Sequence, residues 1–213
     1  MNILSGIEKY RHEFCRHGLI IRHADREFIP DGVHDITTKL NEAGKINAQI
    51  LGKSLKPFKI IKCFSSPVER CIQTANNILD GYSSDVTVTI SNILGEPGPF
   101  VVNCEVAKEH FIKLGTKQVV EKQISNQQLS GIRPTSEGNR ILLNFILSEI
   151  VSYQENNLVL FITHDAILAP FINYLTGEKF GESNWIDFLD GLYLGQKQSQ
   201  LYAVRKSETF QID

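Results

Sequence analysis

The fold of this chain is decided by one stretch near its amino terminus, Gly18-Leu19-Ile20-Ile21-Arg22-His23-Ala24-Asp25-Arg26. Its first residues predict a short buried strand, because a continuous apolar run bounded by polar residues is typical of a parallel strand covered on both faces. In open α/β sheets, ligand sites collect beyond the carboxyl ends of such strands, where Arg22, His23 and Arg26 lie. Guanidinium groups beside an imidazole favour a bound phosphate, and a neutral imidazole can attack phosphorus and carry the phosphoryl group.

A second Arg-His pair, Arg16-His17, comes just before this strand. The residues that precede it, Glu13-Phe14-Cys15, do not form an apolar run. We therefore expect His17 to lie at the surface or in a loop.

The composition is that of an ordinary globular chain, with 213 residues of which 42% are hydrophobic and 22% are charged. This length suits a single domain, residues 1–213. An insertion or lid is expected at about 96–133, where a segment rich in Pro and Gly leads into a polar excursion with one or two short helices. The net charge of −2 gives no reason to expect nucleic acid or an anionic membrane as a partner.

The sequence also lacks the marks of a secreted, membrane or metal-binding protein. The amino-terminal segment is polar and charged rather than an apolar signal core, and no apolar run is long enough to span a bilayer. The four cysteines have no paired spacing, so a reducing, cytoplasmic location is expected. Neither Cys-x-x-Cys nor His-Glu-x-x-His occurs, so we expect no metal and no cofactor.

Two further apolar runs predict strands that end in polar side chains. Lys59 to Phe64 leads to Ser65 and Arg70, and Leu158 to Ile162 leads to His164 and Asp165. Helical patterns alternate with these strands, so the chain is predicted to be an α/β protein with a mainly parallel sheet. Its strand ends then face the same way, and two strand-end histidines with several arginines indicate one phosphate pocket.

Arg70 lies where a helix is expected to leave the second strand, with Ser66 as its N-cap and Pro67 as its first residue. The helix dipole disfavours an arginine in the first turn and favours an anion there. A bound phosphate would explain Arg70, and the alternative is a solvent-facing arginine paired with Glu69 or Asp80.

These residues predict phosphoryl transfer through a histidine. The neutral ring of His23 would attack phosphorus in line, while Arg22, Arg70 and Arg26 hold the equatorial oxygens and His164 donates a further hydrogen bond. A carboxyl group would protonate the leaving oxygen and then deprotonate the water that cleaves phosphohistidine.

At these residues the chain resembles the histidine phosphatase superfamily, the phosphoglycerate-mutase-like proteins. The resemblance implies that His23 is the phosphorylated nucleophile, that Arg22, Arg70 and His164 bind phosphate, and that the fold is a three-layer α/β/α sandwich. Ala24 departs from the family's Arg-His-Gly, where a methyl group can still fit. The matching motifs are Arg22-His23-Ala24, Leu40-Asn41-Glu42-Ala43-Gly44, Ser65-Ser66-Pro67-Val68-Glu69-Arg70-Cys71-Ile72-Gln73-Thr74-Ala75 and Thr163-His164-Asp165.

The resemblance leaves two residues as candidates for the general acid. Members of the mutase-like branch use a glutamate in a loop after the middle strands, where this chain has Glu96. Members of the acid-phosphatase-like branch use the aspartate of a His-Asp pair, which here is Asp165. The compact size favours Glu96, and the alternative readings are a solvent-exposed loop residue for Glu96 and a helix N-cap for Asp165.

The expected function is that of a phosphomonoesterase acting on a small phosphorylated molecule. Mutase-like members usually carry Ser or Thr and Asn shortly after the Arg-His-Gly, whereas this chain has Asp25, Arg26, Glu27 and Phe28 there. The alternatives are a phosphoglycerate-mutase-type phosphoryl transferase and a non-catalytic phosphate-binding regulatory protein. Phosphoproteins as substrates and a homodimer as the assembly both stay open at this point.

Overall fold

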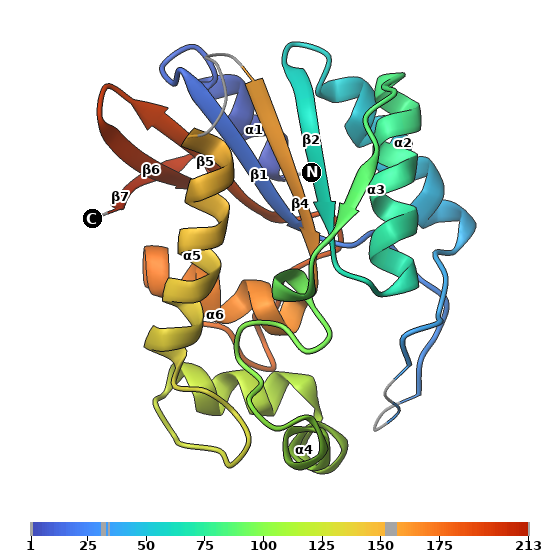
Figure 1. Cartoon of the computed structure of the whole chain (residues 1–213), viewed down its shortest axis with the longest axis vertical. Coiled ribbons are helices and arrows are strands. Elements are labelled where there is room, and N and C mark those ends of the chain that lie inside the picture. Colours follow the sequence, from blue (N-terminus) through green and yellow to red (C-terminus); the bar gives the residue numbers. More distant parts are fainter. Residues whose placement is uncertain (1, 31–32, 34, 152–156, 213) are drawn as a thin grey trace.

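The structure is a computed structural model that describes residues 2–30, 33, 35–151 and 157–212. It confirms an α/β fold built on a mixed sheet in the order β3-β2-β4-β1-β5-β6-β7 (Figure 1). The strands are β1 (Arg16–Arg22), β2 (Lys59–Ser65), β3 (Val88–Ile90), β4 (Asn157–Thr163), β5 (Gly191–Lys197), β6 (Gln200–Arg205) and β7 (Glu208–Ile212). The helices are α1 (Asn2–Tyr10), α2 (Glu42–Ser54), α3 (Glu69–Tyr82), α4 (Cys104–Ile124), α5 (Thr135–Val151) and α6 (Asp165–Thr176), with a short 3-10 helix η1 (Asn92–Leu94).

The sheet is parallel where the sequence predicted it and antiparallel toward the carboxyl terminus. Strands β3, β2, β4 and β1 run parallel to their neighbours. Strand β5 pairs with β1 in the antiparallel direction, and β6 and β7 continue as an antiparallel meander. Strands β5 and β7 lack a continuous apolar run and were not predicted from the sequence.

The register of the parallel strands explains why their polar ends meet. Arg22 is paired with Thr163, and Ser65 is paired with Ile162. The residues that follow, His23, His164 and Ser66, therefore leave three adjacent strands at one edge of the sheet.

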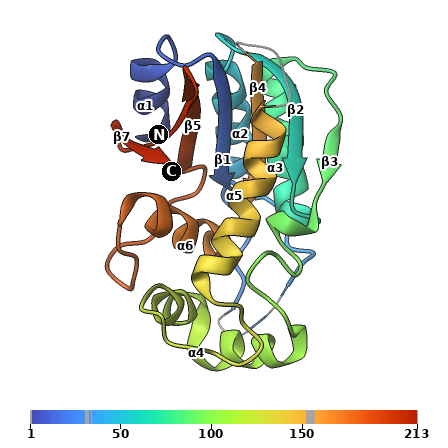
Figure 2. The same cartoon turned by 60° about the vertical axis from the view of Figure 1, so that its left-hand side comes forward.

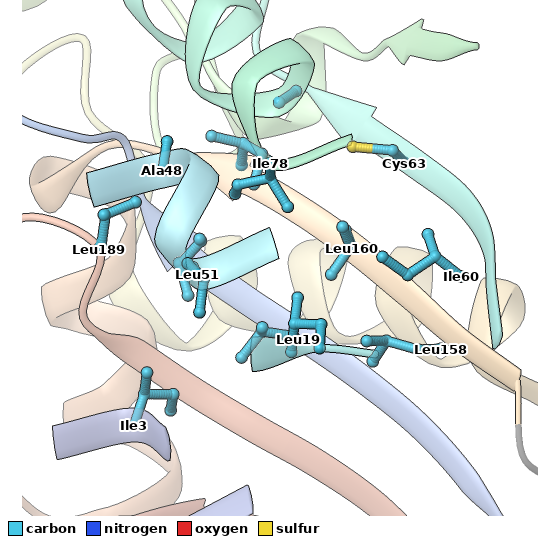
Figure 3. Close-up of a cluster of buried hydrophobic side chains, with 14 of the residues drawn as sticks. Ile3, Leu19, Ala48, Leu51, Ile60, Cys63, Ile78, Leu158, Leu160 and Leu189 are labelled. Carbon is cyan, nitrogen blue, oxygen red and sulfur yellow. The ribbon is translucent and has the colours of Figure 1, made fainter. Parts of the chain in front are cut away.

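Helices cover both faces of the sheet, so the predicted three-layer arrangement is confirmed. Alternate residues of β1 point to opposite cores: Leu19 and Ile21 pack with α1, α2 and α3, whereas Ile20 packs with α5 and α6. Figure 3 shows the first core, with Leu51 from α2, Ile78 from α3 and Leu160 from β4. Figure 2 shows α5 crossing the opposite face of the sheet. Each fully buried Leu or Ile contributes about 2 kcal/mol of hydrophobic free energy.

The start of helix α2 fixes the chain that follows β1. Asn41 is the N-cap, and its side-chain oxygen accepts the Gly44 N–H at 2.8 Å. A Cβ on Gly44 would lie 2.0 Å from the Asp25 carbonyl oxygen, so only glycine permits this close approach. The segment immediately after His23 is thereby held against the start of α2.

The prediction for His17 was wrong. Strand β1 begins at Arg16, and the His17 side chain is buried, with Nδ1 2.7 Å from the Tyr193 hydroxyl. Its ring also packs edge-on against Phe58 at a centroid distance of 4.9 Å. An imidazole is large and flat enough to replace an apolar side chain in an aromatic cluster, provided that one nitrogen finds a polar partner.

The excursion after β3 contains α4, whose helical backbone is interrupted at Gly115, with φ 76° and ψ 160°. Figure 1 shows α4 beyond the edge of the sheet toward which the arrows of β1, β2 and β4 point. This is the edge that carries the two strand-end histidines. No helix in the described part of the chain is both long enough and apolar enough to cross a bilayer.

Candidate active site

The site forms at the ends of β1, β2 and β4, where the Arg70 guanidinium joins two histidines. Arg70 Nε lies 3.1 Å from His23 Nε2, and Arg70 Nη2 lies 3.3 Å from His164 Nδ1. The two imidazole rings are 5.5 Å apart between centroids. Residues that are far apart in the sequence therefore come close enough to contact one tetrahedral anion, as the sequence predicted.

The contacts of His23 fix the tautomer of its ring. Nδ1 lies 2.8 Å from the Ala24 carbonyl oxygen, which can only accept, so Nδ1 carries the proton. Nε2 therefore keeps its lone pair and accepts from Arg70 Nε. Burial lowers the pKa of His23 well below its ordinary value, and electrostatic interactions with His164, Arg22 and Arg70 lower it further. At neutral pH the ring is uncharged, and Nε2 carries no proton.

The contacts of His164 assign the opposite tautomer to its ring. An arginine cannot accept, so Nδ1 is the acceptor of the contact from Arg70. Nε2 then donates to Ser66 Oγ at 2.8 Å. A Cβ on Gly95 would lie 2.5 Å from Ser66 Oγ and 2.8 Å from His164 Nε2. The backbone at Gly95 therefore lies directly against the His164 ring.

The predicted N-cap of α3 was wrong. The helix begins at Glu69 with Val68 as its N-cap, and Ser66 lies before it. Ser66 Oγ accepts the Val68 N–H at 3.3 Å while it contacts His164. The serine of this motif therefore orients a site histidine rather than capping a helix.

Arg70 is in the first turn of α3, as predicted, and its side chain turns into the site. Its third nitrogen, Nη1, donates to the Asp35 carbonyl oxygen at 2.9 Å. Burial lowers the pKa of Arg70. The alternative of a solvent-facing arginine is wrong, and Glu69 instead accepts from Gln73 at 2.8 Å.

Arg22 is held by a cluster that the sequence did not reveal. Its Nη2 forms an ion pair with Asp165 Oδ2 at 2.8 Å, and its Nη1 donates to the Ile186 carbonyl oxygen at 2.6 Å. The Phe188 ring lies 4.1 Å from the guanidinium carbon and 5.6 Å from the His23 ring. Asp165 Oδ2 also accepts from Trp185 Nε1 at 3.0 Å.

The segment 185–188 carries no motif and follows no periodic pattern, so its aromatic residues could not be assigned to the site. The only signal was that a Trp and a Phe, Trp185 and Phe188, lie close together in the sequence.

The remaining predicted residues border this centre. Arg26 donates to the Glu27 carbonyl oxygen at 2.8 Å. Burial lowers the pKa of Arg26, and the nearby charges of Arg70 and Arg22 add to this effect. Glu96 is exposed and directly follows Gly95, the residue against His164.

The loop that carries Glu96 is tied to the end of β4. Thr163 Oγ1 donates to the Leu94 carbonyl oxygen at 2.7 Å, which joins η1 to the strand that delivers His164. The Glu96 carboxyl therefore extends from a backbone position fixed beside the histidines.

Asp165 is the first residue of α6, and the N-cap position belongs to His164. Its Oδ1 accepts the adjacent Ala166 N–H at 2.9 Å. Burial raises the pKa of Asp165, but the Arg22 charge and the Trp185 hydrogen bond outweigh burial, so the pKa is lowered overall. Asp165 is therefore ionised in this arrangement. Among the described residues, no group of three or more His, Cys, Asp or Glu side chains is arranged to hold a metal ion.

Comparison with known proteins agrees with the fold. The model of the histidine phosphatase superfamily (branch 1) matches residues 14–98, which include β1, β2, α3 and the loop to Glu96. No curated protein sequence matches the chain.

Solved structures similar to the whole chain include phosphoglycerate mutase from Bacillus anthracis str. Sterne, with a TM-score of 0.60 at 16% identity over 95% of this chain and 94% of that one. A putative phosphohistidine phosphatase, SixA from Agrobacterium tumefaciens, has a TM-score of 0.53 at 14% identity over 86% and 93%. A mycobacterial glucosyl-3-phosphoglycerate phosphatase has a TM-score of 0.56 at 13% identity over 90% and 91%. At these identities the likeness establishes the fold. Residues 14–98 thus match the histidine phosphatase superfamily, and the chain as a whole has a fold similar to that of phosphoglycerate mutase.

Proposed function

We propose that this protein is a metal-independent phosphomonoesterase that hydrolyses a small phosphorylated substrate through a phosphohistidine intermediate on His23. The observation that carries the proposal is the His23 ring, which is 2% exposed and neutral, with its Nε2 lone pair facing the Arg70 guanidinium. Phosphatases among the similar structures agree with this class of reaction.

The first step transfers the phosphoryl group to the enzyme. His23 Nε2 forms a bond to phosphorus as the bond from phosphorus to the leaving oxygen breaks, and a carboxyl group gives its proton to that oxygen. Arg22, Arg70 and Arg26 stabilise the charge on the equatorial oxygens. The Ala24 carbonyl oxygen, already bonded to Nδ1–H, stabilises the positive charge that the ring gains.

The second step returns the enzyme to its starting state. The carboxylate formed in the first step takes a proton from water, and the water oxygen bonds to phosphorus as the bond to His23 Nε2 breaks. The products are inorganic phosphate and the neutral ring of His23, and the carboxyl group again carries its proton.

We assign the acid role to Glu96 rather than to Asp165. Glu96 is exposed beside the residue that packs on His164, where a leaving group can reach it. Asp165 is bound to Arg22 and Trp185 and is held ionised by them. An acid must carry a proton when the leaving oxygen departs, and the ion pair with Arg22 opposes protonation of Asp165.

The function is tested with a panel of phosphorylated metabolites and with p-nitrophenyl phosphate. We expect release of inorganic phosphate by the wild-type protein and none by His23→Ala. Transfer of the phosphoryl group to an acceptor without release would favour the mutase reading. Phosphate binding without turnover would favour a regulatory protein, and either result contradicts the proposal.

The acid is tested by comparing Glu96→Gln and Asp165→Asn on p-nitrophenyl phosphate and on phenyl phosphate, whose leaving group is poorer. Loss of the acid affects the poorer leaving group most, because that oxygen needs the proton. We expect this selective loss for Glu96→Gln. Equal losses on the two substrates for Glu96→Gln would contradict its assignment.

A further inference from the structure

Asp165 makes more contacts than an acid poised to release a proton requires. Its Oδ2 is shared by Arg22 Nη2 at 2.8 Å and Trp185 Nε1 at 3.0 Å, and its Oδ1 accepts the Ala166 N–H at 2.9 Å. Both oxygens are therefore engaged as acceptors. The carboxylate links β1, the start of α6 and the loop before β5.

Arg22 is oriented from three directions by these same segments. Asp165 holds Nη2, the Ile186 carbonyl oxygen holds Nη1 at 2.6 Å, and the Phe188 ring lies 4.1 Å from the guanidinium carbon. Its Nε is buried and has no hydrogen-bond partner among the residues that the structure describes. A buried donor without a partner is costly unless a ligand satisfies it, which is consistent with a group prepared for an anion.

We propose that Asp165 and Trp185 are positioning residues, which fix the Arg22 guanidinium so that it can bind the phosphoryl group. The inference rests on the proposed function only in treating the pocket around His23 as a phosphate site. The indole N–H holds the carboxylate, and the carboxylate holds the arginine.

Two effects of Asp165 on phosphate binding have opposite signs, which makes the proposal testable. A carboxylate near a bound phosphate repels it, so removing the charge alone would strengthen binding. A carboxylate that positions Arg22 promotes binding, so removing it would weaken binding. Because the ion pair is short and mostly shielded from solvent, with side chains 11% and 20% exposed, we expect positioning to outweigh repulsion.

The test measures binding of inorganic phosphate by isothermal titration calorimetry, which needs no turnover. We expect Asp165→Asn to weaken phosphate affinity about tenfold, the loss of one charge-assisted hydrogen bond. Trp185→Phe changes no charge and should weaken affinity about threefold. Asp187→Asn, which removes an exposed carboxylate from the same loop, is the matched control and should not weaken it.

The route through Arg22 is tested with a double-mutant cycle. Once Arg22→Gln has removed the arginine, adding Asp165→Asn should change phosphate affinity less than twofold. Unchanged or tighter binding by Asp165→Asn, or an equal loss with and without Arg22, would overturn the proposal. Trp185→Phe gives an independent answer if Asp165→Asn does not fold, and wild-type affinity for that variant would also overturn it.

The outcomes separate this inference from the proposed function. If the protein binds phosphate through Arg22 but hydrolyses nothing, the proposed function is contradicted, and the double-mutant cycle of Arg22 and Asp165 can still be measured. If hydrolysis proceeds and the cycle shows no coupling, only the positioning role fails. A positioning residue should also reduce kcat/KM equally for p-nitrophenyl and phenyl phosphate, which an acid would not do.

Discussion

Replacing Arg70 with lysine keeps the positive charge of the site and removes its geometry. The guanidinium contacts His23 through Nε at 3.1 Å and His164 through Nη2 at 3.3 Å, and a lysine has one nitrogen for two rings whose centroids are 5.5 Å apart. Charge-assisted hydrogen bonds contribute about 1.5–3 kcal/mol each. Once His23 Nε2 bonds to phosphorus, the guanidinium can donate to phosphoryl oxygens through two nitrogens and lysine through one. Losing one such bond in the transition state should reduce kcat/KM by about 10- to 100-fold.

The assay is the initial rate of p-nitrophenyl phosphate hydrolysis over a range of substrate concentrations and pH. Arg140→Lys, on an exposed position of α5, is the matched control and should retain wild-type kcat/KM. The Arg70 charge helps to lower the pKa of His23, after burial and the electrostatic effects of His164 and Arg22. Arg70→Gln should therefore move the acidic limb of the pH profile upward, whereas Arg70→Lys should leave it in place. A kcat/KM for Arg70→Lys within threefold of wild type would refute the reasoning.

Three further predictions concern stability and metal dependence. Burial lowers the pKa of His17 to about 4, so the unfolded chain binds more protons between pH 4 and 6.5; stability is lost as pH falls through this range, by about 2–3 kcal/mol. In urea denaturation His17→Asn should lose this part of the pH dependence, and an unchanged dependence would argue against it. Gly44→Ala places a Cβ 2.0 Å from the Asp25 carbonyl oxygen and should lower the free energy of unfolding in urea by about 1–3 kcal/mol. A free energy of unfolding equal to that of the wild type would be inconsistent with this packing. Incubation with EDTA should leave kcat/KM unchanged, and a loss that divalent cations reverse would point to a metal enzyme.

The parallel core of the fold could be predicted because its strands are continuous apolar runs that end in polar motifs. The stretch from Gly18 to Arg26 and the run before His164 each contain an unbroken series of apolar residues that predicts a buried strand. Strand β5 does not, because Gly191 and Gly195 interrupt its apolar residues. Both glycines are needed for packing, since a Cβ at Gly195 would lie 1.9 Å from the Phe14 ring.

The candidate site was likewise predictable in one part and not in another. Residues with a fixed spacing from a strand end, such as His23 and Arg70, were predictable because backbone geometry places them. The roles of Ser66 and Trp185 depend on contacts with residues distant in sequence, His164 and Asp165, and no local pattern encodes such contacts. His17 was misplaced because its environment comes from Tyr193 and Phe58, which tertiary packing brings to it.

The central claim is that His23 carries the phosphoryl group during turnover. It is tested most directly by rapid acid-free quenching of the protein during turnover, followed by peptide mass spectrometry under alkaline conditions that preserve phosphohistidine. The account predicts a phosphorylated peptide with the modification on His23 in the wild-type protein and no such peptide in His23→Ala. Hydrolysis by a wild-type protein that is never phosphorylated at His23, or full activity in His23→Ala, would contradict it.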